Sequence, residues 1–201
     1  MSKLPYSFYQ DTDVNQLAIQ LLGKQLYTFI DGVITSGTIV ETEAYNGEED
    51  KASHAYGGRF TDRTKIMYDE GGISYVYLCY GIHHLFNVVT APKGTPHAVL
   101  IRGLEPVNGL DIMLYRRNKP VLKPALTAGP GALAKAMGID KGLNAKDLCG
   151  EEIWIEDNGL IVRSEDIVAV PRVGVDYAED HALLPWRYYI KGNKFVSKPN
   201  T

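Results

Sequence analysis

Residues 37–45 are a strand-like run, and the side chains of an extended chain alternate between its two faces. The alternation puts Glu41, Glu43 and Tyr45 on one face of the strand. Two buried carboxylates on one face would repel each other, so either this face is solvated or at least one glutamate has a partner. The sequence leaves both possibilities open.

A second alternating run, residues 74–80, puts Tyr75, Tyr77 and Cys79 on one face, and Gly81 then permits a turn into residues 85–90. Residues 74–80 and 85–90 therefore predict a hairpin that carries aromatic rings near its tip. Tyrosines in strands often serve only core packing, and that alternative stays open. Tyrosines near a carboxylate are also typical of a site that stacks a flat ligand and deprotonates water.

The spacing of apolar residues between positions 11 and 26 predicts a helix that Asp11 or Thr12 caps and Gly23 ends. Residues 26–34 form a predicted strand with a turn at Asp31 and Gly32, so the first two strands should pair as a hairpin.

Residues 97–104 are nearly all apolar and predict a buried central strand, interrupted by Arg102. A buried guanidinium needs an anion or several carbonyl acceptors. The structural candidates for this partner are the nearby Glu105 or a cluster of carbonyls, and a functional anion is the alternative.

The remainder of the chain predicts two further helices and several short strands. One helix should begin around Val107 and run to Asn118. Another should begin near Pro130, where free N–H groups at Gly129 and Gly131 either cap the helix or bind phosphate. Short strands are expected at 153–157, 160–164, 167–175, 188–192 and 194–197. The pattern is that of a mixed α+β fold.

Composition narrows the class of protein further. The chain has 201 residues, of which 45% are hydrophobic and 22% charged, as in one globular domain spanning 1–201. Its two cysteines suggest neither a disulfide framework nor a metal site, and no run resembles a signal peptide or a membrane span, so a cytoplasmic protein is expected. The net charge of −3 requires that any binding of nucleic acid use a local basic patch.

Several blocks, in this order, resemble the alkyladenine (3-methyladenine) DNA glycosylase family: LLGKQL, GTIVETEAYNGEEDKASHAYGGRFTDRTKIMY, SYVYLCYGIHHLFNVV, AVLIRGLEP, AGPGALAKAMGI, PRVGV and PWRYYI. The resemblance covers nearly the whole chain. It implies an α+β domain with a curved antiparallel β-sheet, surrounding helices and a protruding β-hairpin. It also implies a monomer, nucleoid-associated in a bacterium, that excises damaged purines from double-stranded DNA without a cofactor or metal.

The resemblance also implies roles for individual residues. Glu43 matches the general base that activates water, and Arg102 matches an arginine near that water. The extruded base would lie among residues that match the family's pocket: Tyr45, His54, Tyr77 and Asn87. Tyr80 resembles the residue that enters the minor groove, with Ile82 and His83 beside it at the hairpin tip.

Cations between the two alternating runs are expected to contact DNA phosphates: Lys51, Arg59, Arg63 and Lys65. Ala132 stands where the family resemblance leads us to expect a lysine, which weakens the case for a phosphate contact there. No lysine is placed to form a Schiff base with the sugar, so hydrolysis without strand cleavage is expected.

Two other functions remain open at this level. A lesion-binding protein would flip bases without cutting them, although Glu43 argues against this. A nucleoside hydrolase would act on small molecules, although a groove-inserting Tyr80 would then have no purpose.

Overall fold

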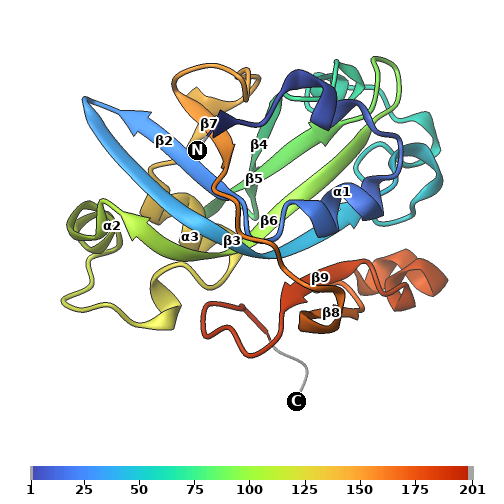
Figure 1. The fold of residues 1–201 in the computed structure, drawn as a ribbon. Coiled ribbons are helices and arrows are strands. Elements are labelled where there is room, and N and C mark those ends of the chain that lie inside the picture. Colours follow the sequence, from blue (N-terminus) through green and yellow to red (C-terminus); the bar gives the residue numbers. More distant parts are fainter. Residues whose placement is uncertain (1, 199–201) are drawn as a thin grey trace.

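A computed structural model describes residues 2–198 and shows a curled, antiparallel sheet with helices packed around it (Figure 1). The main path of the sheet has the order β1-β7-β2-β3-β6-β5-β4, and β9 pairs with both β3 and β8. The strands are β1 Ser2–Lys3, β2 Gln25–Ile30, β3 Val33–Tyr45, β4 Ser74–Cys79, β5 His83–Thr90, β6 His97–Asn108, β7 Ile153–Asp157, β8 Ile167–Val170 and β9 Arg187–Ile190. The α+β class predicted from sequence is confirmed.

Strand β3 is the centre of the fold because its length lets it pair with three strands. Its first half pairs with β2 across the predicted turn at Asp31 and Gly32, where both residues have positive φ. Its second half lies between β6 and β9. The register of β3 against β6 shifts around residues 39–42. Such an irregularity bends a strand and redirects its side chains.

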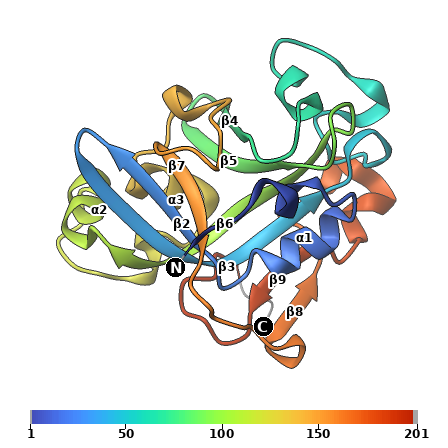
Figure 2. The same cartoon turned by 45° about the horizontal axis from the view of Figure 1, so that its top comes forward.

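Three α-helices cover the sheet: α1 Val14–Gln20, α2 Leu110–Arg117 and α3 Pro130–Met137. Figures 1 and 2 show α1 against β3 and α2 at the far end of the sheet. Their buried side chains pack with the sheet into the main core: Leu17, Leu21, Leu26, Ile39, Phe86, Ile101, Leu104 and Met137.

Some predicted helix boundaries are wrong. Asp13, rather than Asp11 or Thr12, caps α1 by accepting a 2.9 Å hydrogen bond from the N–H of Gln16. Helix α2 begins at Leu110 instead of Val107, because residues 107 and 108 still belong to β6 and Gly109 makes the turn with a φ of 72°. The predicted start of α3 at Pro130 is confirmed.

Two of the short strands predicted near the C-terminus are absent from the described chain. Residues 160–164 and 194–197 form loops and turns, because no neighbouring strand pairs with them. The predicted strand at 167–175 ends at Val170, since Pro171 follows and cannot donate a ladder hydrogen bond. Among the described residues, no helix is long and apolar enough to cross a membrane.

Candidate active site

Glu43 lies near the end of β3, fully buried, and three groups hold its carboxylate. Oε2 accepts hydrogen bonds from the Tyr45 hydroxyl at 2.9 Å and from Arg102 Nη1 at 3.3 Å. Oε1 accepts one from the backbone N–H of Val173 at 2.7 Å. A carboxylate has about four acceptor positions, so Oε1 retains capacity for one further donor such as water.

Glu41, two residues earlier, is fully buried and bound in a different way. Its carboxylate pairs with Arg102 Nε at 3.0 Å and with Arg187 Nη1 at 2.9 Å, and it accepts from the backbone and hydroxyl of Ser197. Three of these donors meet Oε1 and the Ser197 N–H meets Oε2, so Glu41 is held by two arginines and serves to anchor them. The possibility that this strand face is solvated is wrong, and both glutamates have partners.

Arg102 donates to both Glu41 and Glu43, so Glu105, one of the structural candidates, is not its partner. Glu105 instead accepts a 2.8 Å hydrogen bond from Asn193. Because Arg102 also lines the cavity described next, it connects the buried carboxylates to the space where a ligand would lie.

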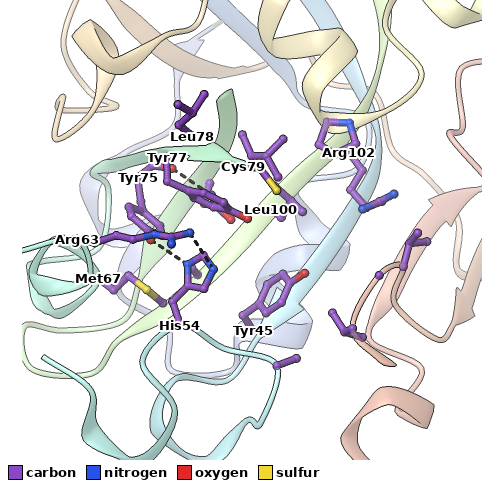
Figure 3. Close-up of a pocket in the computed structure, with 18 of the residues that line it drawn as sticks. Tyr45, His54, Arg63, Met67, Tyr75, Tyr77, Leu78, Cys79, Leu100 and Arg102 are labelled. Carbon is purple, nitrogen blue, oxygen red and sulfur yellow. Dashed lines mark hydrogen bonds between the residues drawn. The ribbon is translucent and has the colours of Figure 1, made fainter. Parts of the chain in front are cut away.

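A cavity of about 410 Å³ opens beside these residues, within the size range of small-molecule sites. Figure 3 shows His54, Arg63 and Tyr77 grouped on one side of the cavity and Tyr45 on the other. The lining is mainly aromatic and apolar, with few polar groups: Tyr45, Ala52, His54, Arg63, Met67, Tyr75, Tyr77, Leu78, Cys79, Tyr80, Leu85, Asn87, Ala98, Leu100, Arg102, Pro130, Val173, Gly174, Val175 and Tyr177. Such walls suit a flat ring system.

Burial sets the ionisation of the polar groups in these walls. Burial, followed by the charge of Glu43, raises the pKa of Tyr45 well above its ordinary value, and burial likewise raises that of Tyr77. Both phenols therefore stay protonated at neutral pH, and Tyr45 remains a hydrogen-bond donor to Glu43.

His54 is neutral and has a defined tautomer. Burial, together with the nearby charges of Arg63 and Arg59, lowers its pKa to about 4. Arg63 Nη2 lies 3.1 Å from His54 Nε2, and an arginine can only donate, so Nε2 is the acceptor. The proton of the neutral ring is then on Nδ1, which donates to the Tyr75 hydroxyl at 2.9 Å.

The turn between β4 and β5 projects Tyr80 from the protein surface. Tyr80 and Gly81 both have positive φ, 50° and 70°, as in the tight turns that join antiparallel strands. The Tyr80 side chain is 90% exposed although it also borders the cavity. Ile82 and His83 beside it are exposed as well. His83 also lies close to α3, where a Cβ at Gly131 would be 2.8 Å from it.

The family model for methylpurine-DNA glycosylase matches residues 7–194. A Bacillus cereus (strain G9842) protein named "Putative 3-methyladenine DNA glycosylase" is 48% identical over 205 residues, covering 96% of this chain and 98% of its own. A protein of the same name from Alkaliphilus oremlandii (strain OhILAs) is 46% identical over 203 residues, covering 98% and 99%.

The chain belongs to the methylpurine-DNA glycosylase family. The family resemblance found in the sequence is thus confirmed. Within this family member, the structure brings together most residues that the sequence assigned to a site. Glu43 lies directly behind two lining residues, Tyr45 and Arg102, to which it is hydrogen-bonded. Seven of the residues assigned from the sequence line one cavity: Tyr45, His54, Arg63, Tyr77, Tyr80, Asn87 and Arg102.

The four cations predicted to contact DNA phosphates in this glycosylase-family protein differ from one another in their surroundings. Lys51 is paired with Glu179 at 2.7 Å and with Asp180 at 2.8 Å, so its charge is already compensated. Lys65 is exposed and paired with Asp62 at 3.1 Å, and Arg59 lies outside the cavity lining. Arg63 lies in the cavity itself. Their roles in DNA binding stay predictions.

The structure adds a supporting ion pair that the sequence reasoning missed. Arg172 is fully buried, forms a bidentate pair with Asp50 and donates to the carbonyl of Ala44 at 2.9 Å. Its guanidinium also lies 4.9 Å from the centre of the Tyr45 ring. These contacts fix the backbone that presents the N–H of Val173 to Glu43. The one sign of this ion pair in the sequence was that Arg172 lies in PRVGV, a block that carries the family resemblance.

Tyr177 is a further lining residue that the sequence reasoning missed. It borders the cavity and its hydroxyl donates to the carbonyl of Ala52 at 3.1 Å. No group of three or more His, Cys, Asp or Glu side chains within residues 2–198 is arranged to hold a metal ion.

Proposed function

We propose that this family member is a monofunctional DNA glycosylase that extrudes alkylated or deaminated purines from duplex DNA and hydrolyses their N-glycosidic bonds. Its substrates would include 3-methyladenine, 7-methylguanine, hypoxanthine and ethenoadenine. The observation that carries the proposal is the position of Glu43: it is fully buried behind an aromatic cavity, yet one acceptor position of its carboxylate is unfilled.

In the proposed reaction, a water molecule donates a hydrogen bond to Oε1 of Glu43 and attacks the anomeric carbon of the extruded nucleotide. The bond between that carbon and the purine nitrogen breaks, its electron pair leaves with the base, and Glu43 accepts the proton of the water. The negative charge of Glu43 also stabilises the positive charge that develops on the sugar. Tyr45 and Arg102 hold the carboxylate in position for both tasks.

Extrusion of a base costs a few kcal/mol of stacking and pairing, and two features of the protein would offset this cost. Tyr80, exposed at the hairpin tip, would fill the gap left in the helix. Tyr45 and Tyr77, both in the cavity lining, would stack on the extruded purine, at about 1–3 kcal/mol for each ring.

Hydrolysis without strand cleavage is supported by the composition of the cavity. Cleavage by a bifunctional glycosylase requires an amine nucleophile that attacks the sugar. Among the described residues that line the cavity there is no lysine.

The test uses a labelled duplex that contains a single deoxyinosine, and free inosine in a parallel reaction. We expect hypoxanthine to be released from the duplex only, and the DNA strand to break only after alkali is added. Binding without release would indicate a lesion-binding protein, and release from inosine alone would indicate a nucleoside hydrolase. Strand breakage without alkali would contradict the monofunctional mechanism.

A further inference from the structure

Arg63 lies in the loop before β4, and its guanidinium enters the cavity. The centre of the guanidinium is 4.6 Å from the centre of the Tyr77 ring, and Nη2 donates to His54 Nε2 at 3.1 Å. Figure 3 shows this side chain against Tyr77 and His54. One ring that we expect to stack on the purine therefore already carries a planar cation.

The charge of Arg63 has no counter-ion nearby. No ion pair involving Arg63 occurs in the described part of the chain, and its polar contacts are with neutral groups, His54 and the Tyr75 hydroxyl. The second arginine of the cavity, Arg102, is neutralised by Glu41 and Glu43. No Asp or Glu is among the described lining residues, so Arg63 gives its end of the cavity an uncompensated positive charge.

This charge acts differently on two classes of damaged purine. Alkylation at N3 or N7 gives the base a positive charge, whereas hypoxanthine and ethenoadenine are neutral. An electron-rich ring by itself attracts a cationic base. A guanidinium already on that ring satisfies this attraction and repels a second cation, and the repulsion is strong in a cavity that excludes water.

We propose that Arg63 is a specificity-determining residue that favours neutral purine lesions over cationic ones. The inference rests on the proposed glycosylase function and refines its substrate class. It differs from the phosphate contact expected from the sequence, because a phosphate contact affects every lesion by the same factor.

The test compares two duplexes of identical sequence, one with 7-methylguanine and one with hypoxanthine, under single-turnover conditions with saturating enzyme. The quantity of interest is the ratio of the two excision rates. In Arg63→Gln, we expect the ratio of 7-methylguanine to hypoxanthine excision to rise at least tenfold over the wild-type value. Arg63→Lys retains the charge and should keep the ratio within about threefold of wild type.

Arg59→Gln is the matched control, because it removes a cation of the same loop from outside the cavity lining. It should change both rates by one common factor. A common factor in Arg63→Gln as well would overturn the inference and leave Arg63 as a phosphate contact. If the wild-type protein releases neither base, the proposed function fails instead, so the two failures are distinguishable.

Discussion

The hydroxyl of Tyr45 donates a 2.9 Å hydrogen bond to Oε2 of Glu43, two residues earlier on β3. The ring proposed to stack on the purine therefore also orients the proposed general base. This coupling means that stacking and base orientation can be separated by removing one oxygen atom.

Tyr45→Phe should keep the stacking surface and lose the hydrogen bond. A hydrogen bond to a charged group contributes about 1.5–3 kcal/mol, so the single-turnover excision rate should fall about tenfold to a hundredfold. Lesion affinity, measured by gel shift, should change less than about threefold. Equal losses of rate and affinity would mean that the hydroxyl acts only in binding.

Glu43→Gln should reduce excision of hypoxanthine by about 10²- to 10⁴-fold, the usual contribution of a general base. Lesion binding should be nearly intact, because the cavity walls do not change and Arg102 keeps its pair with Glu41. Single-turnover kinetics and gel shifts measure the two effects. Full turnover by this variant would refute the role of Glu43.

Glu41→Gln should affect mainly stability. This change removes a buried carboxylate that two arginines share, and breaking such a pair costs about 3–5 kcal/mol. The free energy of unfolding, measured with urea, should fall by that amount. A variant as stable as the wild type would show that Glu41 is not the anchor of these arginines.

Tyr80→Ala should weaken binding to DNA with any lesion by a similar amount, about 1–3 kcal/mol, because the side chain would fill the helix rather than contact the damaged base. Folding stability should be nearly unchanged, since Tyr80 is 90% exposed. Tyr115→Ala on α2, another highly exposed tyrosine, is the matched control and should leave DNA affinity unchanged. A loss confined to one lesion would place Tyr80 in the base pocket.

The lowered pKa of His54 predicts a stability that depends on pH. The ring is neutral in both states at neutral pH, but below pH 6.5 it binds a proton in the unfolded chain first, and in the folded chain only near pH 4. Stability should therefore fall as the pH drops through this window, by up to about 3 kcal/mol from this group.

Urea unfolding of the wild type and of His54→Gln at about pH 7 and about pH 4 measures this contribution, because other titrating groups are common to both proteins. The wild type should lose more stability on acidification than the variant. Equal losses would show that His54 titrates alike in the folded and unfolded chains.

The sequence by itself determined the features that depend on near neighbours. Alternation along residues 37–45 and 74–80 predicted β3 and the β4–β5 hairpin, and Asp31–Gly32 and Gly81 predicted the turns. These predictions succeeded because strand periodicity and turn conformation are fixed by backbone geometry within a few residues. The family resemblance then assigned roles to single positions.

Only the tertiary structure decided how the buried charges are paired. Glu43 accepts from Val173, 130 positions away, and Arg102 pairs with glutamates about sixty positions away instead of with Glu105. It also decided that Arg63 lies against Tyr77 in the cavity. Local periodicity shows which face of a strand a side chain occupies. The partner it meets there is decided by strand register and by loops from distant parts of the chain, because burial forces each charge to find a counter-charge or donor wherever the fold brings one.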